Sequence, residues 1–205
     1  MGESERLIAL EAKYAPTVLQ GRGVFSPHDR NPHAPWNLGG DKMASDRNGY
    51  ADAYAELLPD LYGKVNVVVE LGVFMGVSLA MWCDLFPEAT VIGLDLDFTR
   101  FEDYRPTLEA AGAFRDNEPW LIRCDAYGPL FPLEEALPGP IGLFVDDGPH
   151  TPDATAKMVT GVAPLMARRS AYVLEDFPGG AKVLAVAMQD ATIRDRGRWS
   201  AAVRL

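Results

Sequence analysis

The sequence lacks the features of several large protein classes. It has two cysteines, Cys83 and Cys124, without CxxC spacing, so neither a disulfide framework nor a redox pair is expected. No apolar run approaches the roughly 20 residues of a membrane span, and residues 1–20 lack the uninterrupted apolar stretch of a signal peptide. These absences predict a cytoplasmic protein without a membrane partner.

Basic residues are also scarce. Lys and Arg number 19 against 29 Asp and Glu, which gives a formal net charge of -10. A protein of this charge repels phosphate backbones, so nucleic acid is not expected as a partner. The 205 residues suffice for one domain with a substantial core. Whether the chain forms a homo-oligomer stays open.

Five apolar runs of the sequence each end on a carboxylate. The runs lie at residues 65–70, 90–95, 119–125, 141–147 and 171–176. The acids at their ends are Glu70, Asp95, Asp125, the pair Asp146 and Asp147, and the pair Glu175 and Asp176. Because the carboxyl ends of parallel strands line the ligand crevice of an open α/β sheet, we expect these acids to gather along one edge. An acidic edge suits a cationic ligand or a metal ion.

Helical stretches alternate with these runs. They are predicted at residues 46–62, 76–86, 99–112, 152–167 and 179–191. Alternation of this kind predicts parallel βαβ units, and therefore an α/β fold with a doubly wound, Rossmann-like sheet that is mostly parallel.

The N-terminal part departs from this alternation. Residues 3–14 predict a short helix, and a loop rich in Gly, Pro, His and Asn follows at about 21–41. This loop is too long for a mere connector, so it is either a lid over a pocket or a strap that packs on the body. We divide the chain accordingly into an N-terminal helix and lid loop, residues 1–45, and a cofactor-binding domain, residues 46–205.

A glycine turn follows the first apolar run and opens a helix, where a doubly wound fold binds an adenosine cofactor. Gly72 and Gly76 are present, but a G-x-G-x-x-G dinucleotide fingerprint is incomplete and Glu70 precedes it. A carboxylate about 4 Å from a phosphate costs roughly 4 kcal/mol at an effective dielectric of 20, whereas it attracts a sulfonium or ammonium cation. The turn therefore favours S-adenosylmethionine, with Asp95 placed for the ribose hydroxyls and Asp125 for the adenine amino group.

Several segments resemble a known family. The segments ELGVFMGVSLAMW, VIGLDLD and CDAYG are similar to class I S-adenosylmethionine-dependent methyltransferases. Asp41, Lys42 and Tyr50, together with LFVDDGPH and VLED, narrow the resemblance to metal-dependent sugar O-methyltransferases of antibiotic biosynthesis. These are the macrocin and mycinamicin type, with cephalosporin-hydroxylase-like proteins as relatives. The resemblance covers about residues 40–180.

The resemblance implies transfer of a methyl group from S-adenosylmethionine to a hydroxyl of a small molecule, a sugar or natural-product intermediate, with the help of Mg²⁺ or another divalent ion. It implies Asp147, Glu175 and Asp176 as metal ligands, and carboxylate oxygens suit Mg²⁺. A divalent ion lowers the pKa of a bound hydroxyl, so His150 becomes the candidate base and, with Asp147, a candidate catalytic residue. The candidate cofactor contacts are Glu70, Gly72, Gly76, Ser78, Asp95, Asp125, Asp146 and Lys42.

The chain departs from the family pattern at three places. The family commonly has DDGSH where this chain has Pro149 before His150, and a histidine at the position of Asn48. Proline fixes φ and removes an N–H, so the sequence alone does not fix the position of His150. About 30 residues follow Glu175, so the sheet is expected to be short by roughly one element of its usual C-terminal hairpin, with residues 198–205 as its last strand.

Two rival interpretations remain. Asp95, Asp97 and Thr99 match the D-x-D-x-T of haloacid-dehalogenase-type, Mg-dependent phosphatases, in which the first Asp is the nucleophile. No lysine lies between Thr99 and Asp147, and the nucleophile's strand would normally come first in the fold, so this reading is less favoured. The other rival is a cofactor-binding protein without catalysis, or a dehydrogenase with a nicotinamide cofactor. The missing glycine argues against the dehydrogenase.

Overall fold

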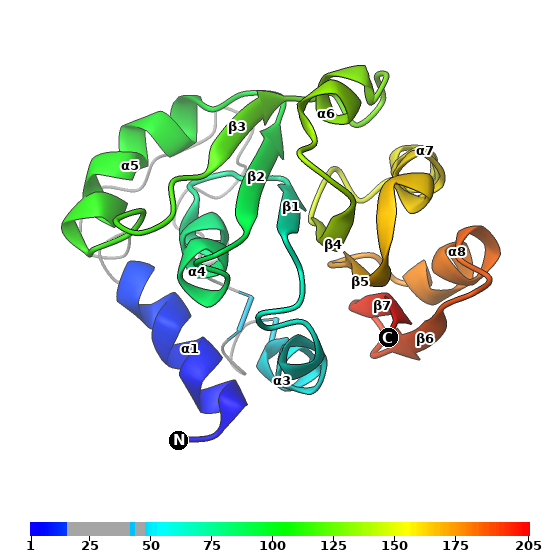
Figure 1. Cartoon of the computed structure of the whole chain (residues 1–205), viewed down its shortest axis with the longest axis horizontal. Helices are drawn as coiled ribbons and strands as arrows, with labels where there is room; N and C mark the ends of the chain where they lie inside the picture. Colours follow the sequence, from blue (N-terminus) through cyan, green and yellow to red (C-terminus); the bar gives the residue numbers. More distant parts are fainter. Residues whose placement is uncertain (16–41, 44–47) are drawn as a thin grey trace, which may run out of the picture.

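The computed structural model of the protein describes residues 1–15, 42–43 and 48–205. In these residues seven strands form one sheet, in the order β3-β2-β1-β4-β5-β7-β6 (Figure 1). The expected lid loop at 21–41 and the motif residue Asp41 lie outside the described residues. The division of the chain after residue 45 therefore stays a prediction.

Five neighbouring strands of the sheet run parallel. They are β1 (Val67–Leu71), β2 (Thr90–Asp95), β3 (Trp120–Arg123), β4 (Ile141–Asp146) and β5 (Met166–Leu174). The two remaining strands are β6 (Thr192–Asp195) and β7 (Ser200–Arg204), and β7 pairs antiparallel with both β5 and β6. The predicted doubly wound, mostly parallel sheet is confirmed.

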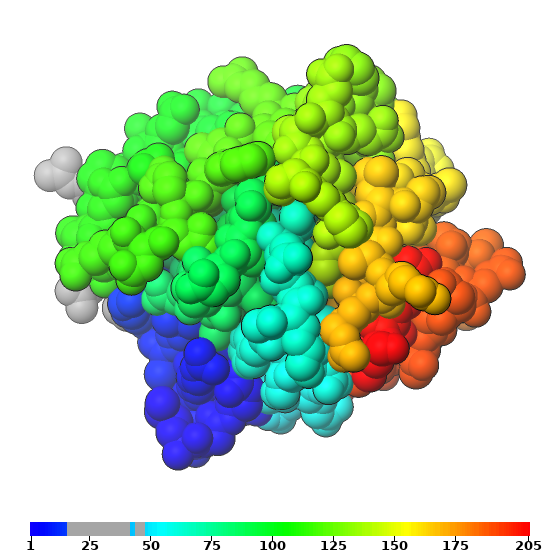
Figure 2. All heavy atoms as spheres, viewed as in Figure 1, coloured from blue at the N-terminus to red at the C-terminus, as the bar shows by residue number. Residues whose placement is uncertain are grey.

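The described helices connect or flank these strands. They are α1 (Glu3–Tyr14), α3 (Ala51–Leu57), α4 (Val77–Leu85), α5 (Thr99–Ala110), α6 (Phe131–Ala136), α7 (Pro152–Val162) and α8 (Gly180–Ala187). Of these, the six-residue helix α6 was not predicted. In the N-terminal part, α1 packs on α3 and α4, and its surface lies against theirs in Figure 2.

Helix α7 illustrates how local residues set an element's bounds. The Thr151 hydroxyl accepts a hydrogen bond from the backbone N–H of Ala154 at 3.4 Å, and Pro152 takes the first helical position. The helix ends at Val162 because a 3₁₀ turn, Ala163–Leu165, follows it and β5 begins directly afterwards. The predicted helix over 152–167 was therefore too long at its C-terminal end.

The sheet has a hydrophobic core on each of its faces. Val68 of β1 packs with side chains from α1, α3, α4 and α5, whereas Val67 and Val69 pack with side chains from α6, α7 and α8. All five residues of β1 and all six of β4 are buried, as expected for strands covered by helices on both faces. Both cysteines are buried and free. No described helix has the length and apolarity to cross a membrane.

The expectation that the sheet is one element short is wrong. Strands β6 and β7 form the complete antiparallel hairpin at the edge of the sheet. Strand β6 was not predicted because its sequence, TIRD, contains a single apolar residue, Ile193. Such a short strand at the edge of a sheet buries too little surface to leave a hydrophobic pattern.

Candidate functional site

The turn between β1 and α4 depends on two glycines. Gly72 has φ +90°, and a Cβ atom there would lie 2.1 Å from the backbone oxygen of Asp147. Gly76 has φ +81°, and a Cβ atom there would lie 2.4 Å from the ring of Phe101. Glycine is therefore required at both positions, since each combines a left-handed conformation with close packing. The absence of side chains brings the turn directly against the end of β4.

Asp95 fixes the same turn from the end of β2. Its Oδ2 accepts hydrogen bonds from the backbone N–H groups of Val73 at 2.9 Å and Phe74 at 3.1 Å, and its Oδ1 accepts one from Asp97 at 3.2 Å. Phe74 has φ +51°, a conformation that is uncommon for a non-glycine residue. The carboxylate that was predicted to bind a ribose thus holds the glycine turn in place.

Two cavities adjoin the turn and share Gly72 and Asp147. The large cavity has a volume of about 310 Å³. Its lining includes Asp95, Leu96, Asp125, Tyr127 and Pro149. The small cavity has a volume of about 50 Å³, and its lining includes Glu11, Lys42, Gly76 and Ser78. Six of the eight predicted cofactor contacts line one of these cavities.

The large cavity is bordered by two residues that the sequence analysis missed. Leu96 is 67% exposed, and Tyr127 is 52% exposed. The Tyr127 backbone N–H donates to Asp125 Oδ1 at 2.9 Å, and its hydroxyl lies 2.6 Å from the Thr151 hydroxyl. An aromatic residue two positions after a strand-end acid, as in CDAYG, is the signal that could have indicated Tyr127.

The remaining two predicted cofactor contacts, Glu70 and Asp146, are buried and line neither cavity. Asp146 Oδ2 accepts a hydrogen bond from the Tyr172 hydroxyl at 2.8 Å, and its Oδ1 accepts one from the Gly148 N–H at 3.2 Å. Burial raises the pKa of Asp146 to about 6, against the opposing effect of these two bonds. Each acid instead contacts a residue that does line a cavity, Lys42 for Glu70 and Gly148 for Asp146, so both carboxylates lie one layer behind the cavity walls.

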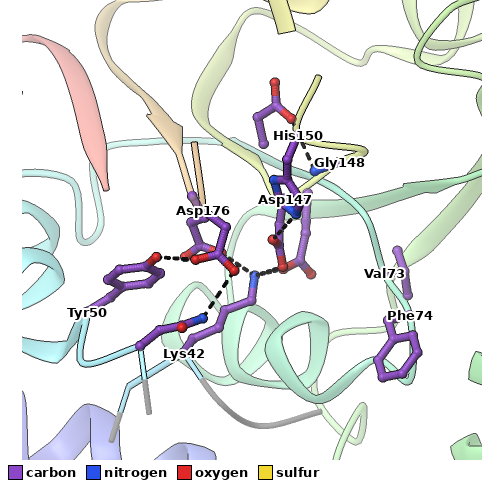
Figure 3. A network of polar contacts seen from close by, with 12 residues as sticks. Lys42, Tyr50, Val73, Phe74, Asp147, Gly148, His150 and Asp176 are labelled. Atoms are coloured by element: carbon purple, nitrogen blue, oxygen red, sulfur yellow. Dashed lines mark hydrogen bonds and ion pairs between the residues drawn. The ribbon is translucent and has the colours of Figure 1, made fainter. Parts of the chain in front are cut away.

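Lys42 forms ion pairs with carboxylates from three strand ends (Figure 3). Its Nζ lies 3.0 Å from Glu70 Oε1, 3.0 Å from Asp147 Oδ2 and 2.6 Å from Glu175 Oε2. Burial acts to lower the pKa of Lys42, but the three carboxylates outweigh it and raise this pKa well above its usual range. Burial also raises the pKa values of Asp147 and Glu175, while Lys42 acts to lower them. Lys42 is therefore a buried ammonium ion.

The backbone around Lys42 is held by a carboxylate of α1. Glu11 accepts hydrogen bonds from the N–H groups of Lys42 at 2.9 Å and of Met43 at 3.1 Å, although it comes from a distant part of the chain. Glu11 is 3% exposed and shares the buried face of α1 with Leu7 and Tyr14. A charged residue on an otherwise apolar helix face is the signal that could have indicated Glu11.

Asp147, His150 and Asp176 form a group of possible metal ligands. Each offers one ligand atom, and these atoms all lie within 4.8 Å of one another. His150 Nε2 lies 3.5 Å from Asp147 Oδ1. His150 follows Pro149 and has φ +52°. It still lies beside Asp147, so the proline does not remove the histidine from this group.

The carboxylate of Asp176 is held by residues from two separate segments of the chain. The Tyr50 hydroxyl donates to its Oδ1, and the Asn48 side chain donates to its Oδ2 at 3.3 Å (Figure 3). Arg198, from the turn between β6 and β7, forms an ion pair with Oδ1 at 3.0 Å. Asp176 itself has φ +51°. These contacts set the direction of its carboxylate.

The structure does not bring Glu175 into this group. Its Oε1 accepts a hydrogen bond from the Tyr54 hydroxyl at 2.6 Å, and its Oε2 faces Lys42. Two of the three predicted metal ligands, Asp147 and Asp176, therefore lie together with the predicted base, His150, while the third points elsewhere.

The residues present fit both groups that the resemblance implies. Two carboxylates and an imidazole are donors that divalent ions accept. Gly72 lines both cavities and Gly76 lines the small one, each without a side chain, as expected where a cofactor approaches the backbone. The strand order and this turn define the Rossmann-like fold of S-adenosylmethionine-dependent methyltransferases.

No family model and no curated protein matches the sequence. Among solved structures, MycE of the mycinamycin biosynthetic pathway, in complex with Mg, SAH and mycinamycin VI, is similar with a TM-score of 0.58 and 17% identity. The match covers 79% of this chain and 50% of that chain, so the protein spans about half the length of MycE. The calicheamicin methyltransferase CalS11 is similar with a TM-score of 0.60 and 15% identity, covering 98% of this chain and 91% of that chain.

A second structure of CalS11, without ligand, is described as a TDP-rhamnose 3'-O-methyltransferase of calicheamicin biosynthesis. It matches with a TM-score of 0.58 and 17% identity over 98% of this chain and 92% of that chain. These structural neighbours thus include a sugar O-methyltransferase, as expected from the resemblance of the sequence. At such low identities the likeness establishes the methyltransferase fold.

Proposed function

We propose that this protein is an S-adenosylmethionine-dependent O-methyltransferase that methylates a hydroxyl of a small molecule with the help of a divalent metal ion, Mg²⁺ or a similar one. The observation that carries the proposal is the position of Asp147. This residue lines both cavities at the glycine turn and also belongs to the group with His150 and Asp176. A cofactor beside the turn and a metal beside Asp176 would therefore meet at one residue.

The two cavities divide the cofactor between them. The large cavity would take the adenosine part, with Asp95 accepting hydrogen bonds from the ribose hydroxyls and Asp125 from the adenine amino group. The small cavity, at Gly76 and Ser78, would take the methionine part. Lys42 is outnumbered by the carboxylates around it, so the environment stays acidic and suits the sulfonium and ammonium charges of this cofactor, whereas it would repel a pyrophosphate.

Asp147 and Asp176 would hold the metal ion, which when bound orients an acceptor hydroxyl and lowers its pKa. His150 lies next to Asp147 and takes the hydroxyl proton as general base. Methyl transfer then depends mainly on the alignment of the oxygen with the methyl group. Because a structural neighbour is described as a TDP-rhamnose methyltransferase, we propose a sugar hydroxyl, free or in a natural product, as the acceptor.

The phosphatase alternative has little support in the geometry. Asp97 Oδ1 accepts hydrogen bonds from the Thr99 N–H at 3.1 Å and from its hydroxyl at 2.8 Å. Asp97 is exposed, and this contact lies at the start of α5. The D-x-D-x-T motif is thus explained as a local helix start, and Asp95 is engaged with the glycine turn.

Calorimetric titration of the wild-type protein with S-adenosylmethionine, its demethylated product and NAD⁺ tests the cofactor. We expect micromolar binding of the first two and none of NAD⁺, and binding of NAD⁺ alone would contradict the proposal. Transfer of a radiolabelled methyl group to a panel of nucleoside-diphosphate sugars tests the reaction. His150→Ala should bind the cofactor like the wild type and transfer no methyl group, which distinguishes an enzyme from a cofactor-binding protein without catalysis.

A further inference from the structure

The three carboxylates around Lys42 form the most charged buried cluster of the described residues. Glu70 is fully buried and Glu175 is 1% exposed, so neither acid can rely on water to stabilise its charge. Lys42 is the residue that pairs with both of them and with Asp147. Figure 3 shows its contact with Asp147. The cluster thus already contains a cation, and this cation belongs to the chain.

The position of Lys42 divides the acids into two sets. Asp147 turns Oδ2 toward Lys42 and Oδ1 toward His150, so it lies between the ammonium and the possible metal ligands. Glu175 is engaged at both oxygens, by Tyr54 and by Lys42. Asp176, the next residue in the chain, has φ +51° and directs its carboxylate to the other side, toward Tyr50 and Asn48.

We propose that Lys42 is a positioning residue that serves as the resident cation of Glu70 and Glu175, and that it keeps Glu175 out of the metal site, which is left to Asp147 and Asp176 with His150 beside them. This inference rests on the proposed function, because it concerns the metal ion of that site. It differs from the ligand set that the sequence resemblance implies, in which Glu175 is a metal ligand.

Elementary electrostatics supports this division. A divalent ion that shared Glu175 with Lys42 would lie close to a buried ammonium, and two like charges in a poorly solvated site repel strongly. A shared Asp147 avoids this conflict, because its two oxygens face opposite sides. The hydrogen bonds from the backbone N–H groups of Lys42 and Met43 to Glu11 hold this part of the backbone in place, which keeps the Lys42 side chain within reach of the three acids.

Binding of Mn²⁺, measured through the loss of the free-ion signal in electron paramagnetic resonance, tests the proposal on the whole protein. We expect Asp176→Asn to weaken Mn²⁺ binding at least about tenfold and Glu175→Gln to change it by less than about threefold. A loss in Glu175→Gln as large as that in Asp176→Asn would overturn the proposal. Failure of the wild type to bind millimolar Mn²⁺ would overturn it as well.

Replacement of the resident cation provides a second test. Lys42→Met leaves the buried acids without a partner, so we expect Mn²⁺ to raise its melting temperature at least about twice as much as that of the wild type. Lys13→Met is the matched control, since Lys13 pairs with Asp84 at the surface, and it should respond like the wild type. An equal response of Lys42→Met and the wild type would contradict the proposal. If Lys42→Met does not fold, the comparison of Glu175→Gln with Asp176→Asn decides.

Calorimetric titration of the wild type with S-adenosylhomocysteine separates this proposal from the proposed function. Absence of cofactor binding would overturn the function, while the Mn²⁺ measurements would still decide the role of Lys42. Normal cofactor binding together with strong Mn²⁺ loss in Glu175→Gln would overturn the role of Lys42 alone.

Discussion

The two halves of the site are built by different means. On the side of β2 and β3, backbone groups dominate: glycines 72 and 76 allow the turn, and Asp95 binds its N–H groups. On the side of β4 and β5, charged side chains dominate, with Lys42 among its carboxylates. The first half should therefore respond to changes of shape and the second to changes of charge, and this difference can be tested.

The largest effect is expected for Gly72→Ala, which changes shape alone. A Cβ atom would lie 2.1 Å from the backbone oxygen of Asp147 in a residue with φ +90°, so strain and a backbone clash add. We expect a loss of about 3 kcal/mol or more in the free energy of unfolding, measured by urea denaturation. Gly179→Ala is the matched control, because Gly179 has φ +85° with no atom within 4 Å of the added Cβ, and should lose only about 1 kcal/mol. Equal losses would show that the close approach at Gly72 is unimportant.

Removal of divalent metal should affect the second half alone. With a chelator present, we expect the rate of methyl transfer to fall at least about tenfold, because the metal ion is the group that we propose lowers the pKa of the acceptor hydroxyl. The affinity for S-adenosylhomocysteine should change less than about threefold, since its two cavities are formed mainly by the glycine turn and the ends of β2 and β3. The comparison between the halves fails if cofactor affinity falls as much as the rate.

The first half was largely predictable from the sequence, and the second was not. The alternation of apolar runs and helices placed Asp95 and Asp125 at one sheet edge, and the glycine pattern located the turn. These are short-range signals, since an acid at a strand end must lie at that edge. The direction of its side chain is not fixed in this way, which is why Glu70 and Asp146 turned out to face the interior.

The second half depends on partners that are distant in the chain. Lys42 lies 28 residues before Glu70 in the sequence, and Tyr54 lies 121 residues before Glu175. The packing of α1 on α3 and α4 and the long-range contacts of Lys42 and Tyr54 with the strand-end acids bring them together. The sequence could name the acids of this half, but not which of them a lysine would neutralise.

A moderate effect is expected for Asp95→Ala, which removes the acceptor of the Val73 and Phe74 N–H groups. The turn loses its support from β2, and a ribose loses a hydrogen-bond acceptor, so we expect S-adenosylhomocysteine to bind about tenfold more weakly in calorimetry. Mn²⁺ binding should stay within about threefold of the wild type, because Asp95 belongs to the other half. A joint loss of both affinities would show that the halves are coupled through Asp147.

The smallest effect is expected for the pH dependence of stability at Asp146, the buried residue next to the proposed metal ligand Asp147. The pKa of Asp146 is raised from 3.8 to about 6, so the wild type loses stability from this group as the pH rises through that range. The Tyr172 hydroxyl donates to the ionised carboxylate, and Tyr172→Phe removes this bond while keeping the ring that stacks on Phe144. We expect urea denaturation to give a loss of about 1 kcal/mol at pH 8, where Asp146 is ionised, and a smaller loss at pH 5, where it is mostly protonated. The loss in Gly72→Ala is steric and should be the same at both values, so a pH-independent loss in Tyr172→Phe would remove the distinction between a half governed by shape and a half governed by charge.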